Sequence, residues 1–349
     1  MIPDESRFAP DPEELVEELD VLPEGWTVGT PDPDDLDDVR RITELLRAHE
    51  REGRGWAGAG KHDVTVELHG LRTRQNVVVR DDTGLVRAWG SVHDRASGRM
   101  LFVHVVERGL DDRAGRACSD VLVEWAVGQA REVGAARGLA VQQIDTGVFA
   151  DDERQRRWLG AEGFEHVRTW WQMNRSVRPD EAGLVDDPAR WERDGVVVRL
   201  VERGRDGAPV EADLRAVHDV LERAFTDHFN SKPETLDEFL FRLSEDPGHR
   251  WDHWWLAEVD GQPAGALVAT ESGSGSYVAY IGVVELARGR GVAKGLLRTV
   301  IADTAVRGRE NVALEVDADS PTGADRLYRG LGWETSYVTE SWHRDVPVP

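Results

Sequence analysis

The residues best suited to chemistry lie in one segment rich in glycine and arginine. It follows an apolar run at 280–284 and precedes an amphipathic helical pattern marked by Val292 and Leu296. Gly289 and Gly291 remove side chains where the backbone must turn and where a bulky anion must approach closely. The free N–H groups at the start of a helix point into such a turn, and the helix dipole adds partial positive charge. The segment therefore predicts a pyrophosphate-binding loop between a strand and a helix.

Three basic side chains, Arg288, Arg290 and Lys294, add formal positive charge to this loop. The alternative is a plain turn with a basic surface, but the strand before it and the helix after it favour an anion site. The loop is not the phosphate loop of the NTPases, because no Gly-Lys-Ser/Thr follows. It is not a good dinucleotide fingerprint either, because no third glycine stands three places on.

Two motifs in this order resemble the GNAT acyltransferases. Residues 288–293 match that family's Arg/Gln-x-x-Gly-x-Gly/Ala signature, and residues 314–333 look like its second motif. The resemblance implies an α/β (α+β) fold, a mixed twisted sheet flanked by helices, in which a bulge in strand four opens a gap to strand five. It also implies that acetyl-CoA, as co-substrate, lies in this gap with its pantetheine arm paired to strand four. By position, the residues that bind it are Ile281, Gly282, Val283, Arg288, Gly289, Arg290, Gly291, Val292, Ala293 and Lys294.

Acetyl transfer to an amine needs an acceptor that loses a proton, a stabilised oxyanion and a proton donor for the leaving thiolate. Tyr328 occupies the position of the family's usual general acid, although a tyrosine at helical spacing from apolar neighbours can also be a packing residue. The base stays open. Its candidates are Glu285 at the end of strand four and His228 or Asp227 in the segment that the family places near the substrate, and water can mediate the step.

Two further patterns in the second half have less specific meanings. His249 and His253 stand four apart, a spacing that can hold a metal, but no third ligand lies nearby and we expect no metal site. Trp251, Trp254 and Trp255 are candidates for an acceptor pocket that holds an amine by cation–π contact, with core packing as the alternative.

The motif-bearing segment lies in the second of two similar halves. Each half has a short apolar run, a helical pattern, a strand–turn–strand signal, and then an apolar strand followed by a long helix. A repeat of roughly 170 residues indicates a duplicated domain. We therefore predict a flexible extension at 1–22, an N-terminal degenerate GNAT domain at 23–175, a linker at 176–195 and a C-terminal catalytic GNAT domain at 196–349.

The first copy departs from both motifs. Aligned on its long helix, it has Arg116 in place of Gly291, so a bulky side chain replaces the glycine that lets backbone meet phosphate. Aligned on the closing glycine–aromatic pair, it has Leu159 where Tyr328 stands. We therefore predict that the first copy is catalytically silent, and that Cys118 is a small packing residue rather than a nucleophile.

The composition limits the partners. The 349 residues carry a net charge of −23, which disfavours nucleic acid and anionic lipid. The charge suits a cationic small-molecule amine, with solubility alone as the alternative explanation. The single cysteine excludes an intrachain disulfide. No apolar stretch approaches the ~20 residues that span a bilayer, and no apolar signal core precedes the first domain. We expect a cytoplasmic protein without a membrane partner, either a monomer or a homodimer.

Together these features predict an acetyl-CoA-dependent N-acetyltransferase that acts by direct attack of a primary amine in the C-terminal domain. The tandem arrangement is also similar to that of mycothiol synthases, which acetylate an amine on a thiol-bearing pseudodisaccharide, although their first copy usually keeps a cofactor loop. A non-catalytic acyl-CoA-binding sensor is the other alternative, and Tyr328 argues against it.

Overall fold

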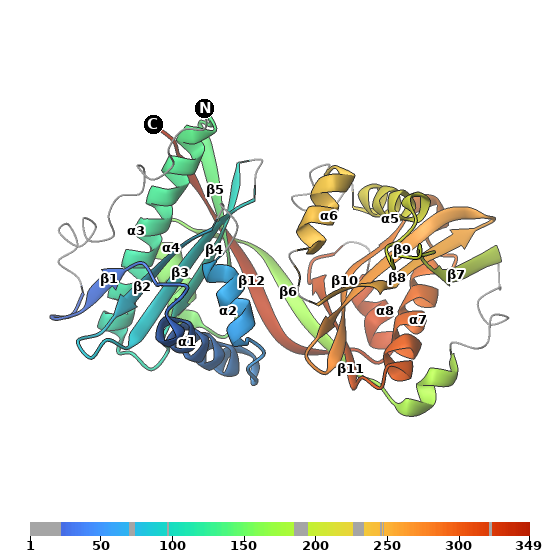
Figure 1. Cartoon of the computed structure of the whole chain (residues 1–349), viewed down its shortest axis with the longest axis horizontal. Coiled ribbons are helices and arrows are strands. Elements are labelled where there is room, and N and C mark those ends of the chain that lie inside the picture. Colours follow the sequence, from blue (N-terminus) through green and yellow to red (C-terminus); the bar gives the residue numbers. More distant parts are fainter. Residues whose placement is uncertain are drawn as a thin grey trace. The chain divides into compact units, whose positions relative to one another are not determined.

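The computed structural model describes residues 22–69, 74–95, 98–184, 195–225, 234–244, 246, 248–320 and 323–349. Its contacts divide the chain into two compact units (Figure 1). Unit 1 comprises Met1–Trp171, Asp317–Asp319 and Tyr337–Pro349, and unit 2 comprises Gln172–Val316 and Ser320–Ser336. The predicted extension at 1–22 lies outside the described residues except for Leu22.

Unit 1 is built on a mixed sheet with strand order β1-β2-β3-β4-β5-β12-β6. β4 and β5 pair in parallel, whereas β1–β2, β2–β3, β3–β4 and β5–β12 are antiparallel. The elements of this unit are β1 (Thr27–Gly29), α1 (Leu36–Arg54), α2 (Lys61–Leu68), β2 (Arg74–Arg80), β3 (Val86–Asp94), β4 (Arg99–Val106), α3 (Asp112–Ala136), β5 (Val141–Phe149), α4 (Glu153–Ala161), β6 (Glu165–Ser176) and β12 (Glu334–Pro347).

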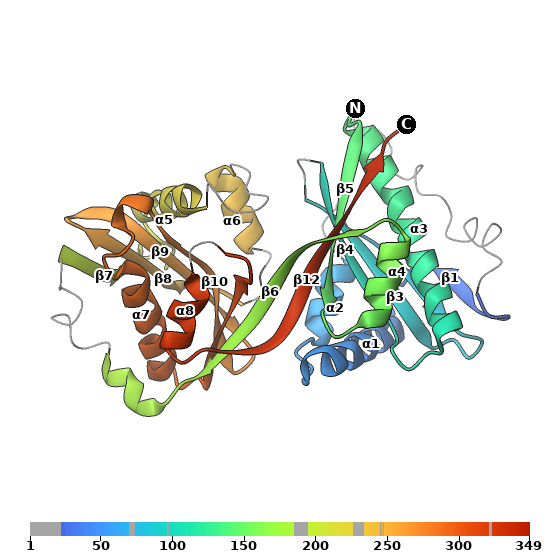
Figure 2. The same cartoon turned by 180° about the vertical axis from the view of Figure 1, so that it is seen from behind.

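Helices cover both faces of this sheet, α1 and α2 on one and α3 and α4 on the other (Figures 1 and 2). The strands alternate accordingly. Val77 and Val79 join the hydrophobic core formed with α3, whereas Val78 joins the core formed with α1. Because both faces are buried, β2 contains an unbroken run of valines rather than an apolar–polar alternation.

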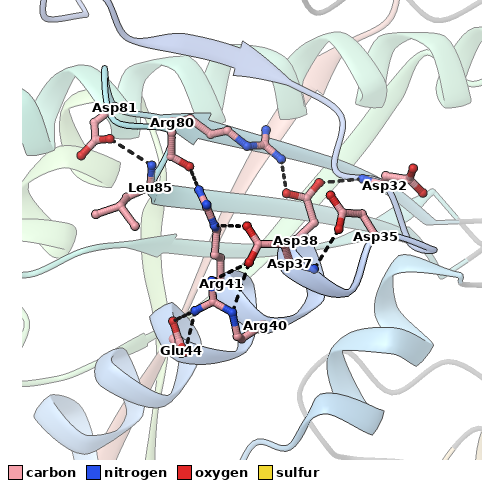
Figure 3. Close-up of polar contacts among 11 residues, drawn as sticks. Asp32, Asp35, Asp37, Asp38, Arg40, Arg41, Glu44, Arg80, Asp81 and Leu85 are labelled. Carbon is pink, nitrogen blue, oxygen red and sulfur yellow. Dashed lines mark hydrogen bonds and ion pairs between the residues drawn. The ribbon is translucent and has the colours of Figure 1, made fainter.

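The start of α1 is tied to the β2–β3 hairpin by charged side chains (Figure 3). Asp35 caps the helix by accepting a hydrogen bond from the Asp37 N–H (2.8 Å). Asp38 pairs with Arg80 of β2 (2.5 Å), and Asp37 pairs with Arg41 (2.7 Å). Carboxylates in a first turn also interact favourably with the helix dipole, so an acidic segment begins this helix stably.

Unit 2 repeats the plan with strand order β6-β11-β10-β9-β8-β7. β10 and β11 pair in parallel, as β4 and β5 do, and β7–β8, β8–β9 and β9–β10 are antiparallel. Its further elements are η2 (Pro179–Leu184), β7 (Val196–Leu200), α5 (Glu211–Ala224), α6 (Leu236–Ser244), β8 (His249–Val259), β9 (Gln262–Ser272), β10 (Gly275–Val283), η5 (Glu285–Ala287), α7 (Val292–Val306), β11 (Asn311–Asp317) and α8 (Ala324–Gly330).

Helices α5 and α6 cover one face of this sheet, and α7 and α8 lie on the other (Figures 1 and 2). Neighbouring residues of β8 show both faces. The ring of Trp254 contacts Phe239 of α6, whereas His253 contacts Asp303 of α7 at 3.1 Å. The predicted mixed α/β fold with two repeats is confirmed.

The last strand of each repeat crosses into the other unit. Residues 339–347 of β12 pair antiparallel with β5 in unit 1, and the end of β6 joins unit 2, where β6 is the neighbour of β11. Figure 2 shows β6 in green and β12 in red, the two strands that contribute to both units. The compact units therefore do not coincide with the ranges 23–175 and 196–349, which stay predictions as limits of the repeats.

No described helix is long and apolar enough to cross a membrane. Within the same ranges, no cluster of three or more His, Cys, Asp or Glu side chains suits a metal ion.

Three histidines of unit 1 are held neutral by their surroundings. Burial lowers the pKa of His49, His93 and His104 to about 4. His104 is fixed on both ring nitrogens. Its Nδ1 accepts from the Gln155 amide (2.9 Å), and its Nε2 donates to the Ser119 hydroxyl (3.0 Å). A proton on Nδ1 would face the Gln155 donor, so protonation breaks this network.

We expect the protein to lose stability as pH falls from 7 to 5. A histidine whose pKa is lowered in the folded state favours folding fully only above its unfolded pKa of about 6.5. This contribution to stability is lost as pH falls toward 4, because the unfolded chain takes up the proton first. The Tm should fall by several degrees over this range. The fall should be smaller in His104→Gln and unchanged in His62→Gln, which replaces an exposed histidine of α2. A Tm that is constant from pH 7 to 5 contradicts this account.

Candidate active site

β10 loses its parallel partner partway along its length. Residues 276–278 pair with residues 312–314 of β11, and a bulge between Val278 and Tyr280 then shifts the register of β10 against β9. From Tyr280 onward the strand pairs with β9 alone among the described strands. Its other edge therefore carries backbone groups without a sheet partner there. The predicted arm-binding residues 281–283 lie in this stretch.

The strand leads into the turn that opens α7, here called the anion-binding loop (residues 285–294). Gly289 and Gly291 have φ values of +79° and +82°, which side chains disfavour. Gly291 is the N-cap of α7, so no side chain caps the first turn. A Cβ at either glycine would meet nothing within 4 Å. The start of α7 thus has no side-chain cap and has room beside its glycines, as an anion site at a helix start requires.

The basic side chains of the anion-binding loop differ in their surroundings. Arg288 and Lys294 are exposed, and neither has an ion pair among the described residues. Arg290 pairs with Asp260 of the β8–β9 turn at 3.0 Å. Val292 is buried, so its backbone rather than its side chain faces the loop. Two of the three predicted positive charges are thus available to an incoming anion.

A cavity of about 630 Å³ borders the loop from the α5 side of the sheet. Val220 of α5, Pro263 of β9 and Arg290 are among its lining residues. Its lining does not include the edge of β10 at 281–283, and we assign it no part in the chemistry.

Two glycines without unusual dihedral angles allow helices to approach the sheet closely. A Cβ on Gly265 of β9 would lie 2.5 Å from Val292 Cγ1 in the first turn of α7. A Cβ on Gly282 of β10 would lie 2.8 Å from Ala224 Cβ of α5. Gly282, which was predicted to bind the cofactor arm, thus has a packing reason to be glycine. Its backbone still lies on the edge that has lost β11.

Tyr328 lies in α8 with its side chain 6% exposed, and its ring packs edge-on against Trp333 at 6.1 Å. Burial raises the pKa of the phenol to about 12. The hydroxyl therefore keeps its proton throughout the neutral range. Such a group can donate a hydrogen bond and does not act as a base near neutral pH.

Glu315 of β11 is a candidate that the sequence analysis missed. It directly follows Leu314, the last residue of β11 that pairs with β10. Residues paired across parallel strands point to the same face. Ser276, which is opposite Val312, accepts a hydrogen bond from Thr304 of α7 (2.9 Å), so Val312 and Leu314 face α7. Glu315 therefore faces the α5–α6 side.

The Glu315 carboxylate is reachable yet crowded. Its side chain is exposed at the surface, but the surrounding protein raises its pKa through desolvation, while a hydrogen bond from Gln172 Nε2 opposes this. Across the gap, Tyr280 contacts Phe239 of α6 and so faces the same side. A carboxyl with a raised pKa at this position can accept a proton near neutral pH. Only the alternation with buried Leu314 and Val316 hints at its orientation in the sequence.

The structure describes only one of the other predicted base candidates. Glu285 is exposed as the first residue of η5. His228 and Asp227 lie outside the described residues. Their roles stay predictions from the sequence.

The two histidines of β8 do not form a metal-binding pair, and its buried tryptophans pack in the core instead of forming an acceptor pocket. His249 packs on Trp251 and Trp254, whereas His253 faces α7, so the two histidines lie on opposite faces and do not share a metal. Trp254 and Trp255 are both buried in the core. They pack the sheet rather than line an open acceptor pocket.

The corresponding helix N-terminus in unit 1 is closed. α3 begins at Asp112, and its N-cap Asp111 accepts a hydrogen bond from the Ala114 N–H (2.9 Å). Two carboxylates thus stand where α7 has a bare glycine. Arg116 is itself engaged with Glu162 (2.7 Å). Asp112 is in turn paired with Arg157 (2.6 Å), so the protein's own charged side chains occupy this helix start.

This geometry corrects the predicted alignment of the first copy. Gly291 caps α7, whereas Arg116 lies inside α3, beyond its cap at Asp111. The residue at the cap position is therefore Asp111 rather than Arg116. The alignment failed because α3 has 25 residues and α7 has 15, so matching positions inside the helices misplaced their starts. Cys118 is fully buried, and burial raises the pKa of its thiol to about 12, as suits a packing residue.

The strand edge of unit 1 is also occupied. β4 pairs with β5 only as far as Phe102, and the β3–β4 register runs without a bulge. Beyond that point, Gln155 of α4 donates to the carbonyl oxygen of His104 (3.0 Å). A side chain of the protein thus takes the backbone acceptor that a ligand would need.

The turn after α4 matches the turn after α8. The Phe164 N–H bonds the Leu159 carbonyl (3.0 Å), and the Trp333 N–H bonds the Tyr328 carbonyl (3.1 Å). Leu159 therefore stands in the place of Tyr328, and unit 1 has no phenol at that position.

Several solved structures have a similar fold. A GCN5-related N-acetyltransferase from Sphaerobacter thermophilus has a TM-score of 0.72 at 24% identity, covering 93% of this chain and 97% of that one. A tandem GNAT protein from the clavulanic acid biosynthesis pathway has a TM-score of 0.63 at 13% identity, covering 93% and 99%. A glucosamine N-acetyltransferase region of a fungal multi-domain β-N-acetylglucosaminidase has a TM-score of 0.67 at 15% identity, covering 93% and 38%. These similarities define the class of fold, a tandem GNAT architecture.

A family model matches part of the sequence. Residues 214–333 match the model of the Acetyltransferase (GNAT) family. Apart from Asp317–Asp319, this segment lies in unit 2, and the resemblance to the GNAT acyltransferases that its motifs predict is confirmed. A search of curated protein sequences found no significant match. The similarity to mycothiol synthases gains no support from these comparisons.

We expect Gly265→Ala to destabilise unit 2 by about 1–3 kcal/mol, because its Cβ would push the first turn of α7 away from the sheet. Urea unfolding measures the change. Gly147→Ala is the matched control, since Gly147 also lies in a strand and a Cβ there meets nothing within 4 Å. Equal stability of the two variants would show that the contact with Val292 is unimportant.

Proposed function

We propose that this chain is an acetyl-CoA-dependent N-acetyltransferase that acetylates a primary amine of a small molecule, and that unit 2 carries the activity. One observation carries the proposal. The part of β10 that lacks a partner on the β11 side is followed, after η5 and the turn at Gly289, by a helix with a bare glycine at its N-cap. An open strand edge suits the amide groups of a pantetheine arm, and an uncapped helix start suits a diphosphate.

The residues along this edge support direct transfer. A backbone N–H of 281–283 can donate to the thioester oxygen, and this hydrogen bond strengthens as the oxygen gains negative charge. The ammonium group of the acceptor first gives one proton to a base, and its neutral nitrogen then attacks the carbonyl carbon and forms the C–N bond. The C–S bond then breaks and its electron pair leaves on sulfur. The nitrogen loses its second proton, which the thiolate or solvent takes up, and an acid hydrogen-bonds the sulfur.

We assign the acid role to Tyr328 and the base role to Glu315. The Tyr328 phenol, with a pKa of about 12, is a weaker acid than a simple thiol at about 8.5. Its contribution is therefore a hydrogen bond that stabilises the developing thiolate. Glu315 lies beside the gap between β10 and β11, with a pKa raised by crowding, which suits proton acceptance. Glu285 and His228 remain alternative bases.

The proposed acceptor is a cation at neutral pH. A net charge of −23 attracts small cations and repels polyanions, so an amine suits the chain better than nucleic acid. Unit 1 is proposed to bind no acetyl-CoA, because Asp111 and Asp112 stand at its helix start and Gln155 occupies its strand edge. Mycothiol synthase-like acetylation and a non-catalytic acyl-CoA sensor are the alternatives.

The first test is binding of acetyl-CoA by calorimetry. Gly291→Glu places a carboxylate at the helix start and should weaken affinity about tenfold or more. Gly308→Glu is the matched control. Gly308 also has a positive φ, +67°, and open surroundings, but it lies just beyond the other end of α7. The control should bind almost as well as the wild type.

Equal affinity of the two glycine variants would overturn the anion-binding loop, and a wild type that gives no heat would overturn the proposal as a whole. Thiol release with a panel of amines then separates enzyme from sensor. Tyr328→Phe should keep its affinity for acetyl-CoA while turnover falls about 10²-fold or more. Binding without turnover on any amine would favour the sensor.

We expect Glu315→Gln to lower kcat by about 10²–10⁴-fold and to flatten the acid side of the pH–rate profile, because no group then takes the amine proton. Glu285→Gln, an exposed residue of η5, should leave kcat nearly unchanged. Steady-state rates from pH 5 to 9 measure both effects. The reverse ranking would assign the base to Glu285.

A further inference from the structure

The end of β6 belongs to unit 2 although it is encoded with the first repeat. Unit 2 begins at Gln172, and β6 extends to Ser176 beside β11. This segment carries two polar side chains that contact the proposed machinery, Gln172 and Arg175. Successive residues of a strand alternate between faces, and these two are three apart, so they reach opposite faces of the sheet.

Gln172 contacts the proposed base. Its Nε2 donates to Glu315 Oε2 across the β6–β11 pair. A donor to a carboxylate fixes its orientation and favours the ionised form. Because this bond lowers the pKa of Glu315, the carboxylate stays ionised, and can accept a proton, down to a lower pH than it would with desolvation alone.

Arg175 holds the turn after Tyr328. Its Nε donates to the carbonyl oxygen of Leu331 (2.7 Å), and its guanidinium lies 5.9 Å from the ring centroid of Trp333. Glu181 of η2, which is buried, fixes the guanidinium from the far side, with Nη1 to Oε2 at 3.0 Å. Trp333 in turn packs on the ring of Tyr328.

Resting on the proposed function, we propose that Gln172 and Arg175 are positioning residues of the active site in unit 2. Gln172 orients the Glu315 carboxylate, and Arg175 holds the turn and the ring on which Tyr328 packs. The first repeat thus completes the catalytic site of the second through its last strand, even though its own site is closed.

Other charged groups on this face form a separate network. Burial raises the pKa of Glu315, and the hydrogen bond from Gln172 opposes this. The titratable groups that β10 and α6 present to this face are Tyr277, Tyr280 and Arg242, and Glu234 lies just before α6. Arg242 pairs with Glu234 (2.6 Å) and donates to the Tyr280 hydroxyl. A change at Gln172 is therefore expected to report on Glu315.

The test compares two variants of Gln172 with a matched control in the full chain. Gln172→Leu removes the donor, and Gln172→Glu keeps the shape while placing a second carboxyl beside Glu315. Gln143→Leu is the control, because Gln143 also donates from its amide to a carboxylate across two strands, that of Asp345 in unit 1 (3.1 Å). The measurement is kcat/KM from pH 5 to 9 with acetyl-CoA and the best amine of the wild-type panel.

Both Gln172 variants should move the acid limb of kcat/KM to higher pH, because the protonated form of Glu315 is no longer disfavoured by the donor. At pH 6 kcat/KM should fall about tenfold, and at pH 9 it should be almost unchanged. Gln143→Leu should keep the wild-type profile. An unmoved acid limb, or a uniform loss at every pH, overturns the role of Gln172. A wild type without turnover on any amine refutes the proposed function instead, and this inference falls with it.

Arg175 is tested by a split between kcat and KM. Arg175→Met should lower kcat while the KM for acetyl-CoA stays constant, and Arg175→Lys, which keeps one donor for the Leu331 carbonyl, should restore part of kcat. Arg178→Met is the control, since Arg178 is an exposed arginine close by in the sequence. Equal kcat values in Arg175→Met and Arg178→Met, or a loss confined to KM, would show that Arg175 has no positioning role.

Discussion

The parallel hydrogen bonds between β10 and β11 end at Val278 and Leu314, because a bulge turns β10 away from its neighbour. Every feature of the proposed site follows from this limit. Beyond this point one edge of β10 is open, and the strand continues into the turn that precedes α7. The limit also places the next residue of β11, Glu315, beside the gap. Gly265 and Gly282 keep the helices close on either face, so the gap opens within a well-packed sheet.

The two repeats differ in how the backbone groups at the strand edge and the helix start find hydrogen-bond partners. Both have a parallel strand pair that stops early, followed by a helix whose first N–H groups need partners. In unit 1 the protein supplies those partners itself, through the Asp111 cap and the amide of Gln155. In unit 2 a glycine cap leaves the helix start without a side-chain partner. The two repeats thus differ mainly in the partners of these backbone groups. In unit 1 they are hydrogen-bonded by side chains of the protein, and in unit 2 they are left for a ligand.

Local features of unit 2 were predictable from its sequence, whereas non-local ones were not. The turn at Gly289 and Gly291 follows from glycine's tolerance of positive φ, a property of the residue itself. The repeat follows from hydrophobic periodicity, whereas the mixed sheet was expected from the resemblance to the GNAT acyltransferases. The orientation of Glu315 depends on which face its strand partner Leu314 presents, and that is decided by packing. The partner of β12 depends on the whole chain, so no local pattern indicated that it pairs with β5.

The crossing of β12 into unit 1 also bears on how the chain matures. β5 has β4 on one side, and on the other it waits for a strand of 14 residues that is translated after all the other described strands. During synthesis of the entire second repeat, the first repeat thus presents a naked β edge, the feature through which nascent chains aggregate. The topology therefore leaves one edge of β5 without its native partner until the final strand has been made.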